Sequence, residues 1–177
     1  MMAGQSHYTP PMPQFDTPVK LLIVVAPYYK DIADDLVAGA KAVAESAGAA
    51  WDLIEVPGAL EIPTAIRIAQ RTSNFDGFVA LGCVIRGETT HYDTVCNDSS
   101  RALTLLGLDG CCVGNGILTV ENHGQAVVRA GEQDKGGGAA AAALHLVALS
   151  RKWSRTPKGI GFQSGSYRVA GEGPVTA

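Results

Sequence analysis

Short apolar runs alternate with segments of helical periodicity along most of this 177-residue chain, and this alternation constrains the fold more than any other feature. The stretch from Lys20 to Ala26 is apolar after its first residue, which is typical of a strand buried on both faces. Further strands are predicted at 51–56, 75–85 and 111–118, and helices at about 32–47, 60–71, 91–106, 121–130 and 138–151. We therefore expect an α/β domain of three layers, in which a four-stranded parallel sheet with right-handed crossovers is flanked by helices.

Proline and glycine mark the two ends of the chain. Residues 1–18 contain four prolines, which predicts an extended arm, because proline fixes φ and removes a backbone donor. Residues 153–177 are rich in glycine and show no periodicity, which predicts a flexible tail. The folded domain is expected to span residues 19–152.

Composition narrows the class of partner. The hydrophobic fraction is 46%, which supplies a sizeable core, and the formal net charge of −3 argues against a nucleic-acid binder held by a basic face. No apolar run is long enough to cross a bilayer, and no secretory signal opens the chain, so we expect no membrane partner. The four cysteines lack metal-like pair spacing and are expected to be reduced thiols in the cytoplasm.

The last predicted helix is apolar almost all round. Small and branched apolar residues fill 139–144, and Leu146, Val147 and Leu149 continue them. A helix without a polar face is usually buried on both sides, whereas a four-stranded sheet covers only one. We therefore expect this chain to associate with copies of itself.

The densest polar cluster, residues 85–93, follows the third predicted strand. Gly87 permits an unusual turn, and Thr89 and Thr90 place hydroxyl groups where a helix begins. The free N–H groups and positive dipole end of a helix bind anions, most naturally a phosphate. A helix simply capped by threonine explains the same residues equally well, and the sequence leaves both interpretations open.

His91 lies in the first turn of that helix and is a candidate for accepting a proton near pH 7. The alternative is a surface or capping histidine, and the two are about equally favoured beside a candidate anion pocket. A metal site built from Glu88, His91 and Asp93 matches no common zinc spacing, so no metal is expected. Cys83 and the other cysteines are expected to be small core residues, not nucleophiles.

Three other positions carry possible binding groups. The turn after the second strand, 56–61, offers backbone N–H groups and the Glu61 carboxylate, although an ordinary strand-to-helix turn explains it as well. Tyr28 follows the first strand and is placed either to stack on a flat ring or to pack. Arg129 and Lys135 flank a late glycine, where each suits either a phosphate or an exposed helix end.

With these turns aligned, the chain resembles the lumazine synthase family, the 6,7-dimethyl-8-ribityllumazine synthases of riboflavin biosynthesis. The resemblance rests on three motifs, VPGALEIP at 56–63, LGCVIRGETTHYD at 81–93 and GILTVEN at 116–122, and it spans nearly all of residues 19–150. It implies a flavodoxin-like fold and a condensation of 5-amino-6-(D-ribitylamino)uracil with 3,4-dihydroxy-2-butanone 4-phosphate. It also implies that no metal or organic cofactor is used.

The resemblance further implies a homopentamer with active sites between subunits, and it assigns roles to individual residues. His91 would transfer protons, Tyr28 would stack on the pyrimidine, and Arg129 would grip phosphate. The remaining substrate-binding residues implied are Ala59, Leu60, Glu61, Cys83, Val84, Ile85, Glu88, Thr89 and Asn115, with Lys135 as a further candidate. Asn115, Arg129 and Lys135 would come from a neighbouring subunit.

This chain departs from the family pattern at some of these positions. Asn115 stands where an aromatic residue is common, Tyr28-Tyr29 replaces a commoner Phe-Asn pair, and Glu88 puts a carboxylate near the expected phosphate. The short connection from Gly131 to Lys135 leaves pentamers, decamers and sixty-subunit shells all open. Two rival functions use a similar scaffold: a non-catalytic lumazine or flavin carrier or shell subunit, and an unrelated flavodoxin-like phosphosugar enzyme.

Overall fold

The computed structural model describes residues 8–154, so most of the predicted tail and the first residues of the predicted arm lie outside the described residues. Residues 8–19 contain no helix or strand. The strands are β1 (Lys20–Val25), β2 (Ala50–Glu55), β3 (Gly77–Ile85) and β4 (Val113–Val120). The helices are α1 (Lys30–Ser46), α2 (Glu61–Thr72), α3 (His91–Leu108), α4 (His123–Ala130) and α5 (Lys135–Ser154).

The sheet is parallel, with the strand order β2-β1-β3-β4, which confirms the predicted fold class. From β1 the chain passes first to β2 on one side and then to β3 on the other. The order therefore reverses between β1 and β3, and parallel sheets bind ligands at the carboxyl ends of strands beside such a reversal.

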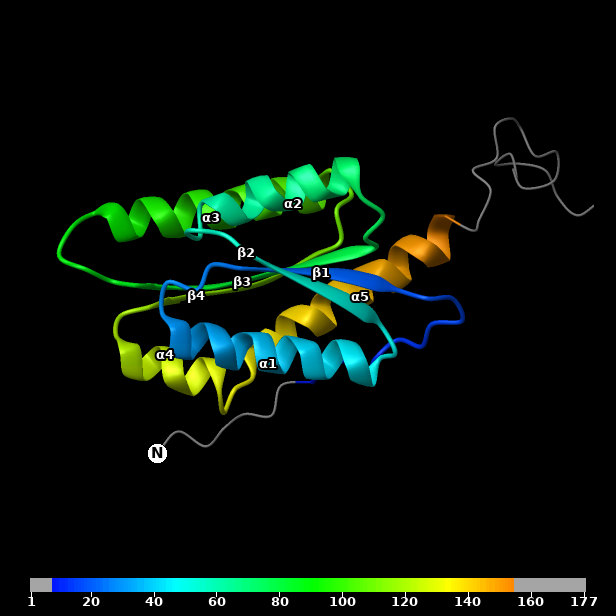
Figure 1. Cartoon of the computed structure of the whole chain (residues 1–177), viewed down its shortest axis with the longest axis horizontal. Helices are drawn as coiled ribbons and strands as arrows, with labels where there is room; N and C mark the ends of the chain where they lie inside the picture. Colours follow the sequence, from blue (N-terminus) through cyan, green and yellow to red (C-terminus); the bar gives the residue numbers. More distant parts are fainter. Residues whose placement is uncertain (1–7, 155–177) are drawn as a thin grey trace, which may run out of the picture.

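Helices cover both faces of the sheet. Helices α2 and α3 lie on one face, and α1, α4 and α5 lie on the other (Figure 1). Side chains of β1 alternate between the two cores: Ile23 packs with Leu36 and Leu144, while Val24 packs with Ile62. Because both faces are covered, the residues of β1 after Lys20 are buried, as its continuous apolar run predicts.

Glycines of β4, the strand predicted at 111–118, allow α5 to lie close to it. A Cβ at Gly114 would overlap the carbonyl oxygen of Ala139 in α5, and one at Gly116 would lie 2.9 Å from the Cβ of Ala139. These glycines therefore permit close helix–sheet packing instead of interrupting the strand.

Some predicted boundaries were wrong by a few residues. Helix α5 begins at Lys135 and not near 138, because the Asp134 side chain accepts a hydrogen bond from the Gly137 N–H at 2.8 Å and starts the helix through a glycine run. Strand β3 begins at Gly77 and not at 75, and the carboxylate of Asp76, just before it, accepts from the Lys20 N–H at 2.8 Å. Among residues 8–154, no helix has the length and apolar character needed to span a bilayer.

Candidate functional site

A pocket of about 420 Å³ lies at the carboxyl end of the sheet, beside the reversal in strand order. Four segments line it: the turn after β1, the turn after β2, the end of β3 and the start of α3. Nine of the residues predicted to bind or react line this pocket, namely Tyr28, Ala59, Leu60, Glu61, Cys83, Val84, Ile85, Thr89 and His91. The structure thus brings together residues that are up to 63 positions apart (91 − 28 = 63).

Strand β3 extends past the end of β1 and so leaves one of its edges unpaired by that strand. The β1–β3 ladder ends where Val25 faces Leu81, whereas the β3–β4 ladder continues to Ile85. The Leu81 carbonyl accepts from the Ala26 N–H on the β1 side, and alternate residues of a strand turn their N–H and C=O groups to the same side. The backbone groups of Cys83 and Ile85 therefore face the side on which β1 has ended, beside the pocket.

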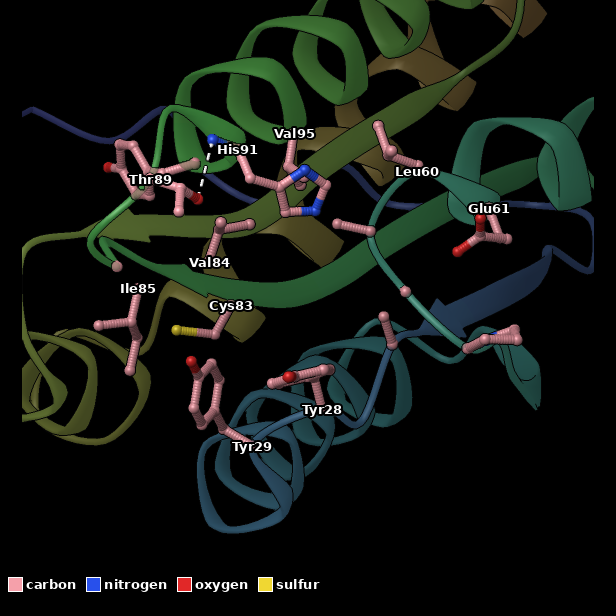
Figure 2. Close-up of a pocket in the computed structure, with 16 residues that line it drawn as sticks. Tyr28, Tyr29, Leu60, Glu61, Cys83, Val84, Ile85, Thr89, His91 and Val95 are labelled. Carbon is pink, nitrogen blue, oxygen red and sulfur yellow. Dashed lines mark hydrogen bonds between the residues drawn. The ribbon is translucent and has the colours of Figure 1, made fainter.

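Side chains from the end of β3 reach both faces of the sheet. Val84 lies on the same side as His91, Leu60 and Val95, while Cys83 lies on the side of Tyr28 and Tyr29 (Figure 2). The pocket therefore wraps around the end of β3, with an imidazole on one side and a pair of aromatic rings on the other.

The two aromatic rings differ in exposure. Tyr28 is 75% exposed, whereas Tyr29 is half-buried, and the rings meet edge to face with their centroids 5.1 Å apart. Burial raises the pKa of the Tyr29 hydroxyl, with smaller contributions from Tyr28 and Cys83. Tyr29 therefore stays neutral near pH 7, and exposed Tyr28 keeps a ring face free for a planar ligand.

The turn after β2 brings a carboxylate and a tight backbone turn into the pocket. The Glu61 N–H donates to the Gly58 carbonyl at 3.2 Å, and Glu61 begins α2. A Cβ at Gly58 would lie only 2.9 Å from the Glu61 carboxylate, so the missing side chain lets Glu61 lie over the turn. Pro63 follows in the first turn of α2, where a missing N–H costs little.

The start of α3 has no side-chain cap from its N-cap residue. Thr90 occupies the N-cap position, but its hydroxyl makes no capping hydrogen bond within the part of the chain that the structure describes. Thr89 Oγ1 accepts from the His91 N–H at a long 3.4 Å (Figure 2). A strong cap from the Thr90 hydroxyl, one of the two interpretations that the sequence left open, is therefore absent here, and the helix start is open to an anion.

Cys83 is a core thiol that faces the pocket. It is 8% exposed, and burial raises its pKa to about 11, with a smaller contribution from the Asp31 carboxylate. At neutral pH this thiol is protonated and a poor nucleophile. Within residues 8–154, no cluster of three or more His, Cys, Asp or Glu side chains is placed to hold a metal ion.

Four predicted site residues do not line this pocket. Glu88 is exposed on the turn before α3, and Lys135 is exposed at the start of α5. Asn115 is an exposed residue of β4 and lines a second hollow, of about 280 Å³, between β4 and α3. Arg129 is half-buried on α4, where its Nη1 donates to the Gln125 carbonyl at 3.1 Å.

The predicted site residues did not include several residues of the pocket wall, among them Tyr29, Tyr92 and Val95. Tyr92 follows His91 directly, and both side chains of this first turn of α3 line the pocket. Val95 is buried, lies one turn after His91 and closes the pocket as well. Spacing along α3 was the available signal, since residues one turn apart share a helix face.

Comparison with known proteins agrees with this geometry. The family model described as 6,7-dimethyl-8-ribityllumazine synthase matches residues 18–151. A 6,7-dimethyl-8-ribityllumazine synthase of Jannaschia sp. (strain CCS1) is 57% identical over 172 residues, covering 96% of this chain and 97% of the relative. One from Novosphingobium aromaticivorans is 54% identical over 137 residues, covering 76% and 99%. A 6,7-dimethyl-8-ribityllumazine synthase 1 of Mesorhizobium japonicum is 48% identical over 159 residues, covering 85% and 97%. With the family model and these relatives matching the whole α/β domain, the chain belongs to the 6,7-dimethyl-8-ribityllumazine synthase family.

Proposed function

We propose that the pocket at the end of β3, completed by a second copy of the chain, is where this enzyme carries out the lumazine synthase reaction of riboflavin biosynthesis. In that reaction, 5-amino-6-(D-ribitylamino)uracil condenses with 3,4-dihydroxy-2-butanone 4-phosphate. The amine adds to the ketone, phosphate leaves, and the ring closes with loss of water. The observation that carries the proposal is the gathering of nine expected site residues around one pocket.

The pyrimidine would lie between Tyr28 and the end of β3. The exposed Tyr28 ring offers a face for stacking, and the Cys83 and Ile85 backbone groups on the β1 side offer donors and acceptors to a heterocycle edge. The Ala59–Glu61 turn would hold the ribityl chain, because a carboxylate and backbone N–H groups suit a polyol.

The four-carbon phosphate would lie at the start of α3. The helix dipole and open N–H groups there favour an anion, and the Thr89 hydroxyl lines the pocket beside them. Glu88 is exposed and does not line the pocket, so we leave its carboxylate out of the phosphate site. This assignment removes the conflict between two negative charges.

His91 would move protons between the two substrates. Its imidazole lies beside Val84 and Leu60 in the pocket wall, two residues after Thr89 (Figure 2). Each step needs reactants held together and protons moved, and none needs a strong nucleophile from the protein. Orientation alone can supply about 7–11 kcal/mol of barrier reduction, and a positioned acid–base group adds about 10²–10⁴-fold in rate.

A second copy would complete the site with positive charge. The residues lining the pocket include no lysine or arginine, yet a phosphate dianion is best bound by a cation. Arg129, Lys135 and Asn115 all lie outside the pocket of their own chain. The apolar residues Leu146 and Leu149 on α5, each 40% exposed, favour association as well. We therefore assign these three residues to a neighbouring subunit of a cytoplasmic homopentamer.

Mixing the purified full-length chain with both substrates tests the proposal through the fluorescence of the lumazine product. We expect product to form in stoichiometry with released phosphate. Binding of added lumazine without its formation would instead identify a carrier, and an absence of both would exclude this pocket as a lumazine site. Omitting the four-carbon phosphate is the control, because the pyrimidine alone cannot give the second ring.

A further inference from the structure

Arg86 lies next to the pocket wall and contacts both β4 and α3, but it does not line the pocket itself. It follows β3 directly, and its N–H donates to the Val120 carbonyl at 2.9 Å, which carries the β3–β4 ladder one residue further. The residues on either side of it, Ile85 and Gly87, both line the pocket. Its side chain turns away toward α3 and the end of β4.

The guanidinium of Arg86 makes three contacts, all with the elements that flank the pocket. Its Nε donates to Glu121 Oε2 at 2.9 Å, in the turn after β4. Its Nη1 reaches Asp93 Oδ1 at 3.4 Å, in the first turn of α3. The guanidinium carbon also lies 4.1 Å from the ring centroid of Tyr92, which forms part of the pocket wall.

These contacts matter because the start of α3 lacks a side-chain cap from its N-cap residue. The Thr90 side chain does not cap the helix, and the bond from the His91 N–H to Thr89 Oγ1 is long. Gly87 has no atom within 4 Å of an added Cβ, so this turn lies in open space. Arg86 therefore supplies ion pairs and a ring contact that link this helical turn to the end of β4.

We propose that Arg86 is a positioning residue, which fixes His91 and Tyr92 by holding the first turn of α3 against the end of β4. The inference rests on the proposed function of the pocket. Displacing a reacting group by about 1 Å can cost about 10²-fold in rate, whereas partly exposed ion pairs contribute little to global stability. The Arg86 side chain is 41% exposed, so its loss should lower turnover more than stability.

The test compares Arg86→Met, Arg86→Lys and a matched control, Arg67→Met. Arg67 pairs with Asp109, just after the other end of α3, and its side chain is 38% exposed. The Arg67→Met variant therefore loses a similar ion pair far from His91. We expect Arg86→Met to lower kcat about 10-fold, with the KM for the pyrimidine changed less than about twofold. Arg86→Lys keeps the charge but not the planar stacking, and should lower kcat by about 3-fold. Arg67→Met should leave kcat within about twofold, and all thermal midpoints should stay within about 4 °C of wild type.

Hydrogen exchange gives a second readout that needs no catalysis. We expect amides of residues 87–93 to exchange faster in Arg86→Met than in wild type or Arg67→Met. If Arg86→Met unfolds the chain, Glu121→Gln removes only one charge and should show the same changes in weaker form. Unchanged hydrogen exchange at 87–93, or equal kcat in Arg86→Met and Arg67→Met, would overturn the inference about Arg86. The proposed function would still stand in that case if the wild-type chain is active. A wild-type chain that makes no lumazine would overturn the proposed function, and the exchange result would still decide the role of Arg86.

Discussion

Gly136 of α5 packs directly against the backbone of Leu36 in α1. A methyl group on Gly136 would overlap the carbonyl oxygen of Leu36, and both residues are buried. Helices α1 and α5 thus approach as closely as their backbones allow, on the sheet face that also carries Cys83 and Tyr29 at its binding edge. Close backbone packing of this kind leaves no flexible side chain that can yield to a larger residue.

Replacing Gly136 with alanine should therefore destabilise the fold. We expect Gly136→Ala to lower the free energy of unfolding by about 2–3 kcal/mol, because the obstructing atoms belong to the backbone. Gly138→Ala, two residues later, is the matched control. Gly138 is exposed, has no atom within 4 Å of an added Cβ, and lies in a helix, so alanine there should stabilise by up to about 1 kcal/mol. Denaturant titrations at one protein concentration would measure both, and equal effects would contradict the packing argument.

The buried thiols should make the free energy of unfolding depend on pH in the alkaline range. Burial raises the pKa of both Cys83 and Cys111 to about 11, whereas an exposed thiol titrates near 8.5. Between these values the unfolded chain has lost protons that the folded chain keeps, so the free energy of unfolding should fall as pH rises from about 9 to 11.

The double variant Cys83→Ala/Cys111→Ala should show a shallower fall over that range, measured as unfolding midpoint against pH. It keeps four other groups whose raised pKa values act in the same direction, so the difference isolates the thiols of Cys83 and Cys111. These groups are Tyr29, Tyr92, Cys96 and Cys112. Parallel curves for wild type and variant would show that the thiols do not contribute.

His91→Ala should slow turnover without abolishing it. We expect kcat to fall on the order of 10²-fold, because a positioned acid–base group contributes that much while binding and orientation remain. His123→Ala is the control, since His123 lies outside the pocket and contacts Asp31 Oδ2 at 2.8 Å from its Nε2. Turnover of His123→Ala should stay within about twofold of wild type. An undiminished kcat in His91→Ala would remove the proton-transfer role.

The layered fold was predictable because its strongest signals are local. The apolar run of β1 and the helical spacing in α1 each report burial of a single element, and Gly48 ends α1 in a left-handed conformation with φ of 69°, as its position indicated. Three predicted binding turns meet in one pocket for the same reason: parallel strands place their carboxyl ends at one edge.

Features that depend on two distant segments were not predictable from periodicity. The end of β4 at Val120 is set by pairing with Ile85, so the predicted end at 118 was wrong. Ser99 is buried on the inner face of α3 although it is polar, and its hydroxyl donates to the Cys96 carbonyl at 3.4 Å. The contacts of Arg86 likewise join residues 35 positions apart, and no spacing rule for one element reveals them.

The position of Arg129 outside the pocket leads to the most discriminating prediction about assembly. If His91 and Arg129 act in one site but come from different copies, each single variant damages every site of its own oligomer. Arg129→Ala should mainly raise the KM for the four-carbon phosphate, with little change in the KM for the pyrimidine, because the lost cation would contact only phosphate.

When His91→Ala and Arg129→Ala chains are unfolded together and refolded as an equal mixture, about a quarter of the sites should combine an intact His91 with an intact Arg129. Activity should then rise to about a quarter of wild type at low phosphate substrate, well above either variant alone. Mixing His91→Ala with the double variant His91→Ala/Arg129→Ala is the control, since no combination of those chains restores an intact His91. A mixture no more active than the average of its parents would show that both residues serve the same copy, and the site would then have to close within one chain.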